Sequence, residues 1–407
     1  MTYEILTKLY YKNQEEYQQQ AQIRRQSPAC QMLPVPIAEN QAFFCYCPEL
    51  VCSLNSLLKK SVKIRNLFAL LPKVARHSYS VRCLIDEIIL TNEIERIHCT
   101  RQEINQILID EGQHKNKDVR LRGLVLKYKK LILNVYYIID LYNAEDLRVL
   151  YDEIVLPEIA KADRPDGLIL RKGPVSVVSP TDKEKHRGMA PPEENIIAAV
   201  NTALALLQNE QIPKVIAIAL LHYYLGYIHP FYDGNGRLSR FISSYLLQKE
   251  LEPLIALRLS YAIKNNIKLY YDTFDTVNNK KNLGDCTPFI LMFLNMLNIA
   301  ADSLIEQIGE GRQKLEYYQH MLLKKMGRNS KMSDLAFVLI QSNLFYTDEL
   351  TVKQLAETFE VSVQTMNQRL KQAQNIGLPL KIEKKGRHYF YSLDLEEFEE
   401  FCKTLPD

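Results

Sequence analysis

His229-Pro230-Phe231-Tyr232-Asp233-Gly234-Asn235-Gly236-Arg237-Leu238-Ser239-Arg240 is the stretch that decides how this chain is organised. An apolar run over 215–225 precedes it, and a second periodic apolar segment over 238–247 follows it. These patterns predict two helices joined by a loop. The glycines at 234 and 236 let the loop backbone adopt left-handed angles and approach a ligand closely. Free N–H groups at the start of the second helix favour an anion there.

The residue types in this stretch fit phosphoryl or nucleotidyl transfer. Arg237 and Arg240 are three residues apart on one helix face, so both can reach a polyphosphate. Asp233 is a hard oxygen ligand suited to Mg²⁺ on the same phosphates. His229 can take a proton near neutral pH. The alternative is an Asn-Gly turn with solvated arginines, but cations at a helix N-terminus oppose the helix dipole unless an anion lies between them.

The twelve residues match the pattern His-x-Phe-x-Asp-Gly-Asn-Gly-Arg-x-x-Arg, and on this ground the chain resembles the Fic family of protein adenylyltransferases. The resemblance implies transfer of AMP from Mg-ATP to a Ser, Thr or Tyr hydroxyl of a target protein. It implies that His229 is the catalytic base and Asp233 the magnesium ligand. The residues implied to bind the ATP phosphates are Gly234, Asn235, Gly236, Arg237, Leu238, Ser239 and Arg240.

An upstream segment, Thr91-Asn92-Glu93-Ile94-Glu95, resembles the Ser/Thr-x-x-x-Glu inhibitory segment that many Fic proteins carry. The resemblance implies that Glu95 pairs with Arg240, takes the place of the ATP γ-phosphate and inhibits transfer. Arg96 follows, where the family usually has Gly or Asn.

Asp166 to Val178 is short, β-branched and bounded by glycines, which predicts a hairpin. An isolated pair of strands is marginal in water, so we expect an exposed edge. The resemblance implies that this hairpin is a flap that covers the nucleotide and holds a target segment by strand addition. The implied flap residues are Val175, Ser176, Val177 and Val178, and an extended polar loop is expected over 179–194.

Three downstream residues, Tyr270, Tyr271 and Asn278, resemble the family's contacts on the adenosine side. The alternative is that the tyrosines pack between helices, which we expect for one of the two. His222 precedes the loop by under two helical turns and is expected to be a packed histidine rather than a second base.

Near the C-terminus, two short helices and a strand-turn-strand segment over 379–392 resemble a winged helix-turn-helix domain. The helix over 363–374 exposes residue types suited to base edges and phosphates, and basic residues flank the wing turn. Winged helices also serve as protein-contact or dimer modules, and the acidic run over 396–400 would repel a phosphate backbone, so DNA stays an open partner. The residues concerned are Gln364, Thr365, Asn367, Gln368, Arg369, Lys371, Lys384, Lys385 and Arg387.

A length of 407 residues suggests two or three domains. The predicted fold is mainly α, a Fic-type helical core with a small β-hairpin flap plus a C-terminal winged helix-turn-helix domain. The predicted ranges are 1–118 for an N-terminal helical region with the inhibitory helix, 119–304 for the Fic catalytic domain, 305–327 for a linker helix and 328–407 for the winged helix. Within these, separate helices are expected over 260–276, 288–304 and 307–326.

Apolar residues make up 47% and charged residues 24%, as in soluble globular proteins. The net charge of +3 does not demand a nucleic-acid partner. No apolar run is expected to reach the ~20 residues of a membrane span, and the N-terminus lacks a signal-peptide pattern. A cytoplasmic enzyme without a membrane partner is the simplest interpretation.

Eight cysteines scattered over the chain do not form a disulfide framework. Cys30, Cys45, Cys47 and Cys52 lie near one another, but their spacing fits a zinc site poorly. We expect buried or free thiols.

Two other functions remain open. One is a DNA-binding regulator whose nucleotide site acts as a sensor. The other is a different Fic chemistry, namely transfer of UMP or phosphocholine, or removal of AMP. The target protein and the oligomeric state, including a homo-oligomer, are open as well.

Overall fold

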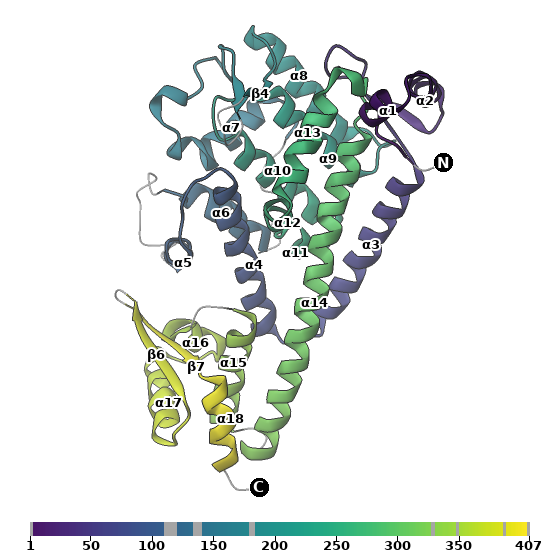
Figure 1. The fold of residues 1–407 in the computed structure, drawn as a ribbon. Helices are drawn as coiled ribbons and strands as arrows, with labels where there is room; N and C mark the ends of the chain where they lie inside the picture. The colour runs from purple at the N-terminus through teal and green to yellow at the C-terminus, as the bar shows by residue number, and fades with distance from the viewer. Residues whose placement is uncertain are drawn as a thin grey trace. The chain divides into compact units, whose positions relative to one another are not determined.

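The computed structural model describes residues 3–109, 120–132, 141–178, 184–326, 330–346, 350–385 and 388–404. Within these ranges the chain is mainly helical, with three small sheets (Figure 1). It divides into two compact units, one formed by Met1–Val62 with Leu84–Asp302 and the other by Lys63–Cys83 with Ser303–Asp407. The predicted ranges 1–118 and 119–304 therefore both contribute to the first unit.

The core of the first unit is built around α9 (Lys214–Ile228). Every residue of α9 from Val215 to Leu225 is buried, and a helix that is apolar on all sides belongs inside a protein. Helices α8 (Glu193–Ala205) and α10 (Asn235–Glu250) pack against it. The remaining helices of this unit are α5 (Arg101–Ile109), α6 (Arg122–Ile132), α7 (Ala144–Ile154), α11 (Pro253–Ala256), α12 (Leu259–Asn265) and α13 (Ile267–Asn278). The single helix predicted over 260–276 is thus two helices, because the chain breaks at Asn266.

Helix α7 begins where its sequence indicates. The side chain of Asn143 accepts a hydrogen bond from the Asp146 amide at 2.9 Å, and the Asp146 carboxylate accepts one from the Asn143 amide at 3.3 Å. This reciprocal pair is a capping box, which satisfies two of the free N–H groups at the helix start.

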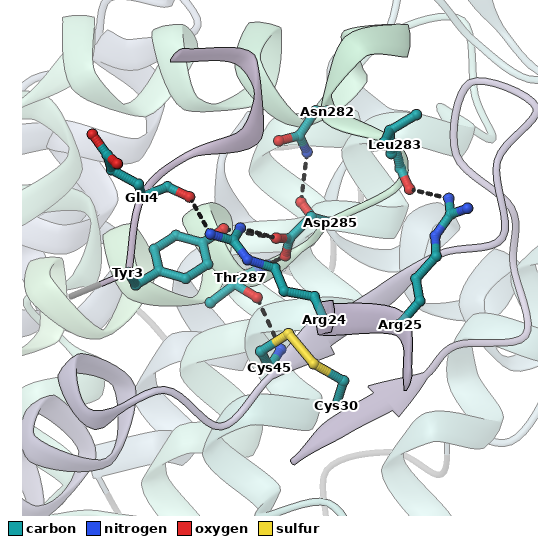
Figure 2. A network of polar contacts seen from close by, with 10 residues as sticks. All are labelled: Tyr3, Glu4, Arg24, Arg25, Cys30, Cys45, Asn282, Leu283, Asp285 and Thr287. Carbon is teal, nitrogen blue, oxygen red and sulfur yellow. Dashed lines mark hydrogen bonds and ion pairs between the residues drawn. A yellow bond between two sulfur atoms is a disulfide. The ribbon is translucent and has the colours of Figure 1, made fainter. Parts of the chain in front are cut away.

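The N-terminal segment folds onto the turn before α14 (Figure 2). It comprises α1 (Leu6–Lys12), α2 (Gln14–Gln26), β1 (Cys30–Met32) and β2 (Phe43–Cys45). The buried carboxylate of Asp285 accepts hydrogen bonds from the Tyr3 hydroxyl at 2.9 Å and from the Arg24 guanidinium at 3.1 Å. The Cys45 amide donates to the Thr287 hydroxyl at 2.9 Å. These contacts join two segments that are separated by more than half of the chain in sequence.

Cys30 and Cys45 form a disulfide that links β1 to β2 (Figure 2). The expectation of free thiols is therefore wrong for this pair, because the antiparallel register sets Cys30 opposite Cys45. Cys47 and Cys52 are free, and the described residues contain no group of three His, Cys, Asp or Glu that could hold a metal ion.

The hairpin differs from its prediction. Its strands are β3 (Ser176–Val178) and β4 (Glu184–Arg187), so the second strand lies in the segment expected to be a loop. Residues 168–170 are not a strand, because their amides donate hydrogen bonds to the Glu193 carboxylate instead of to a neighbouring strand. Residues 179–183 of the expected polar loop lie outside the described ranges.

Three long helices are α3 (Pro48–Ala69), α4 (Lys73–Ile94) and α14 (Thr287–Met326). The two helices predicted over 288–304 and 307–326 are one continuous α14, because nothing between them breaks the helix. By length and composition α14 could cross a membrane, and 67% of its most apolar window is buried inside the protein, as is usual for a core helix. The sequence expectation missed this window because Asn295 and Asn298 interrupt its apolar run.

The second unit contains α15 (Lys331–Phe345), α16 (Val352–Thr358), α17 (Val363–Asn375) and α18 (Leu395–Thr404). Strands β5 (Leu350–Thr351), β6 (Leu380–Lys385) and β7 (His388–Leu393) form an antiparallel sheet in the order β5-β7-β6. The helices expected near 350–359 and 363–374 are confirmed as α16 and α17. Arg387 of the predicted wing turn lies outside the described ranges.

Candidate functional site

The loop between α9 and α10 is held rigidly. His229 ends α9 in the left-handed conformation (φ 52°), and Gly234 precedes α10 in the same conformation (φ 80°). The Asn235 side chain accepts from the Phe231 amide at 3.0 Å and donates to the Phe231 carbonyl at 2.8 Å. Phe231 is fully buried and stacks on Tyr151 with ring centroids 3.8 Å apart. Phe231 thus anchors the loop to the core.

The imidazole of His229 is neutral over the physiological range. Dense burial lowers its pKa to about 4, against a smaller opposing effect of the Gly226 carbonyl. The residue as a whole keeps partial contact with solvent, although its Nδ1 is buried. A neutral, partly accessible imidazole can accept a proton, as a general base must.

The guanidinium of Arg240 is enclosed by the C-terminal end of α4. It donates to the Thr91 hydroxyl at 2.7 Å, to the Thr91 carbonyl at 3.0 Å and to the Glu95 carboxylate at 2.7 Å. The pairing of Glu95 with Arg240 that the resemblance implies is therefore present. Arg96 follows in the left-handed conformation (φ 60°), which explains why Gly or Asn suits this position.

The Glu95 carboxylate also lies against the first turn of α10. A Cβ atom added at Gly236 would meet Glu95 Oε1 at 1.9 Å, so only glycine leaves room for it. Free N–H groups and the helix dipole both favour an anion at this point. The predicted anion site thus contains a carboxylate of the chain itself.

Arg237 is paired as well, with a residue that the sequence did not indicate. Its guanidinium lies 3.1 Å from the Glu158 carboxylate, and both side chains are buried. Burial raises the pKa of Glu158, and the charge of Arg237 opposes that rise. Glu158 lies 79 residues before Arg237, and no local pattern marks a pair at such a separation.

Leu238 and Ser239 contribute differently from the charged residues. The Leu238 side chain is buried, and its N–H already donates to the Gly234 carbonyl at 3.1 Å. The Ser239 hydroxyl donates to the Gly236 carbonyl at 3.0 Å. Both groups are engaged within the helix.

Asp233 is exposed, and its Oδ1 accepts from the Gly234 amide at 2.5 Å. Mg²⁺ is usually held by one or two carboxylates together with substrate phosphates and waters rather than by a full protein cage. A lone exposed carboxylate beside a helix start fits a magnesium ion that arrives with a nucleotide.

His222 is a packed histidine, as expected. Its ring nitrogens lie 2.8 Å from the Ser243 hydroxyl and 2.8 Å from the Tyr270 hydroxyl, and burial lowers its pKa to about 3. Tyr270 is thereby the packed member of its pair, whereas Tyr271 is 39% exposed. Asn278 accepts from the Tyr223 hydroxyl at 2.7 Å, which ties it to α9.

The predicted flap residues lie at the start of the hairpin. Val175 precedes β3, and its carbonyl accepts from the Gly188 amide at 3.0 Å. Ser176 is exposed. Val177 and Val178 follow in β3, and their backbones pair with β4.

Comparison with known proteins points to this same loop. Residues 141–247 match the model of the Fic/DOC family. Proteins named protein adenylyltransferase Fic from Aedes aegypti and Culex quinquefasciatus are each 38% identical over 72 residues, 18% of this chain and 13% of theirs. One from Nematostella vectensis is 34% identical over 97 residues, 24% of this chain and 21% of its own. The chain thus aligns with only a small part of each relative's length.

Two solved structures are also similar. A Fic family protein from Desulfovibrio desulfuricans G20 gives a TM-score of 0.47 at 17% identity, covering 87% of this chain and 98% of that one. Fic-1 (aa134–508) from C. elegans gives 0.42 at 18% identity, covering 64% and 74%.

Proposed function

We propose that the chain transfers AMP from Mg-ATP to a hydroxyl side chain of a target protein, and that Glu95 restrains this activity. One observation carries the proposal. The start of α10 already attracts an anion, the Glu95 carboxylate, 2.7 Å from Arg240 and beside the loop that begins at His229. An ATP phosphate has the charge and oxygen geometry to replace that carboxylate. The Fic/DOC match over 141–247 supports the same function.

The proposed reaction begins with a hydroxyl of the target next to His229. The neutral imidazole takes the hydroxyl proton while the hydroxyl oxygen forms a bond to the α-phosphorus of ATP. The bond from that phosphorus to the bridging oxygen breaks, and pyrophosphate leaves with the electron pair. Backbone N–H groups near Gly234 and Gly236 stabilise the negative charge on the α-phosphate.

Asp233 would hold Mg²⁺, which supplies positive charge to the phosphates when bound. Arg240 would hold the terminal phosphate once Glu95 has moved away. Arg237 would stay paired with Glu158, which offsets much of its charge, and would contribute less to phosphate binding than Arg240. The β3–β4 hairpin would cover the nucleotide and bind a target segment along its edge, with Tyr271 and Asn278 on the adenosine side. A cytoplasmic location suits a reaction that consumes ATP.

The test is the His229→Ala variant in a Glu95→Gly background. Incubation with α-labelled ATP and Mg²⁺ should label the chain itself, and loss of a general base should reduce the rate by roughly 10²–10⁴. ATP binding should persist, because the imidazole does not hold the phosphates. His320→Ala, at an exposed position on α14, is the matched control. Equal labelling in the His229→Ala variant would remove His229 from the mechanism.

The mass of the adduct separates this reaction from the other Fic chemistries. AMP, UMP and phosphocholine add different masses to the modified residue. A chain that removes AMP would strip a pre-labelled protein instead. An adduct with a mass other than that of AMP would show that the donor is not ATP, while the proposed site would stand.

A second candidate function is DNA binding by α17 and the β6–β7 hairpin, which follow the order of a winged helix. Helix α17 carries no Asp or Glu, and it exposes Gln364, Asn367 and Gln368, which suit base edges. If this unit binds DNA, the full chain should reduce the electrophoretic mobility of duplex DNA at low salt, and this effect should disappear as the salt concentration rises. No retardation at low salt would leave a protein-contact role for this unit.

A further inference from the structure

Arg171 is a fully buried arginine that forms no ion pair within the described ranges. In those ranges its guanidinium donates to four backbone carbonyls. Nε donates to His229 O at 2.8 Å, Nη1 to Gly173 O at 2.6 Å, and Nη2 to Met189 O at 2.8 Å and to Ile228 O at 3.2 Å. A buried cation is costly unless its donors are satisfied, and here four carbonyls satisfy them.

The four acceptors belong to two structural features. Ile228 and His229 are the end of α9, where the last carbonyls lack helical partners and the dipole favours a cation. Gly173 and Met189 lie on the segments that lead into and out of the β3–β4 hairpin. One side chain therefore fastens both ends of the hairpin to the backbone of His229.

The packing around this guanidinium leaves no spare room. A Cβ atom added at Gly188 would lie 2.7 Å from Val175 Cγ1, 2.9 Å from Arg171 Nη2 and 3.0 Å from His229 Cβ. The hairpin, Arg171 and His229 can approach this closely only because residue 188 is a glycine. The adjacent Met189 amide also donates to the Ile228 carbonyl, at 3.0 Å.

The segment that leads into Arg171 is fixed by a carboxylate. Glu193, which is buried, accepts from the amides of residues 168, 169 and 170 at 2.9, 2.7 and 2.7 Å. Burial raises the pKa of Glu193, but these donors outweigh that effect and the net pKa is lowered. The carboxylate therefore stays charged and holds the segment that carries Arg171.

His229 needs such support, because the left-handed conformation (φ 52°) is unfavourable for a non-glycine residue. The bonds from Arg171 to the carbonyls of residues 228 and 229 stabilise this conformation directly. They also fix the distance between the imidazole and the hairpin.

We infer that Arg171 is a positioning residue, which sets the imidazole of His229 and the β3–β4 hairpin in one fixed arrangement. The inference rests on the proposed function, in which the hairpin binds the target and His229 takes the proton of its hydroxyl. A displacement of about 1 Å in such an arrangement can cost roughly 10²-fold in rate. ATP binding should change much less than the rate, because Arg240 and the start of α10, which are proposed to hold the phosphates, do not contact the Arg171 guanidinium in the described ranges.

The experiment compares Arg171→Lys with Arg148→Lys in the full chain. Arg148 is the matched control, because it donates to Ile169 O at 2.8 Å in the same segment and to Asp152. Thermal unfolding establishes that both variants fold. Gly188→Ala is the second variant, because its methyl group would crowd Val175, Arg171 and His229 without removing the cation.

Two measurements are made. Amide hydrogen exchange over 184–190 and 228–232 reports the attachment of the hairpin and needs no catalysis. We expect exchange to become tenfold faster or more in Arg171→Lys and in Gly188→Ala, and to stay unchanged in Arg148→Lys. In the Glu95→Gly background, kcat for AMP transfer should fall roughly 10²-fold with KM for ATP within about twofold.

Unchanged exchange in Arg171→Lys, whatever the result in Gly188→Ala, or an unchanged kcat in Arg171→Lys, would overturn the inference. If the Glu95→Gly chain transfers no AMP at all, the proposed function fails. The exchange result then still decides whether Arg171 holds the hairpin to His229, so the two failures are distinguishable.

Discussion

Arg237 and Arg240 lie three residues apart on α10, and each pairs with a carboxylate, but the two pairs are built differently. In the pair of Arg237 with Glu158 both partners are buried, with side-chain exposures of 2% and 7%. Arg240 is equally buried at 1%, yet its partner Glu95 is 29% exposed. Glu95 also sits at the end of α4, whereas Glu158 lies in a one-turn helix, Leu156–Glu158, packed after α7.

The difference separates a structural pair from an exchangeable one. If a carboxylate without access to water moved away, it would leave the buried charge of its partner unpaired. Glu158 therefore stays with Arg237. A carboxylate that already contacts water can yield its place to another anion at a small cost. Of the two arginines predicted to hold phosphates, Arg240 is therefore the one whose anion can change.

The largest effect is expected from Glu158→Ala, which leaves Arg237 buried without its carboxylate. Breaking a buried pair in this way costs roughly 3–5 kcal/mol. The free energy of unfolding in urea should fall by that amount. Glu95→Ala should cost less, roughly 1.5–3 kcal/mol, because Arg240 keeps both of its bonds to Thr91. Equal losses would show that the two pairs are alike.

A smaller effect is expected from Glu95→Gly on nucleotide binding. An incoming phosphate must displace a charged hydrogen bond worth roughly 1.5–3 kcal/mol, which corresponds to ~10–150-fold in affinity. The apparent Kd for Mg-ATP should fall accordingly, and self-labelling should rise. Glu93→Gly is the control, because Glu93 lies in the last turn of α4, two residues before Glu95, and its carboxylate forms an ion pair with Lys264. Indistinguishable affinities in the two variants would reject the inhibitory role.

The smallest effect is expected from Arg96→Gly, next to Glu95. Glycine adopts the left-handed conformation of this position without strain, so stability should rise by about 1 kcal/mol. Arg96→Ala keeps the strained backbone conformation, so its stability should not rise. Urea unfolding of both variants measures the difference, and equal stabilities would contradict the strain. If the affinity for ATP also changes, the helix end helps to set the position of Glu95.

The chemistry of the loop could be predicted from sequence because it is contiguous. Base, carboxylate, glycines and arginines fall within twelve residues, so one window contains them all. The N-cap at Asn143 and the boundaries of α17 were predictable for the same reason, since capping and periodicity are local. The Glu95–Arg240 contact was accessible only through the family resemblance.

The remaining features depend on partners distant in sequence. Glu158 and Glu193 are ordinary acidic residues until the fold brings Arg237 and the amides of 168–170 to them. Strand β4, Glu-Lys-His-Arg, has no β-branched residue, and its pairing with β3 alone makes it a strand. Likewise, only the antiparallel register of β1 and β2 distinguishes Cys30 and Cys45 from the other cysteines.

The attachment of the N-terminal segment to Asp285 has a consequence for synthesis on the ribosome. Arg24 is made 261 residues before Asp285. At roughly 5–20 residues per second, its partner emerges some tens of seconds later. Until then Leu6, Leu9 and Phe43, all buried in the finished fold, have no turn at 280–286 to pack against. We expect the nascent chain to depend on chaperones over this interval.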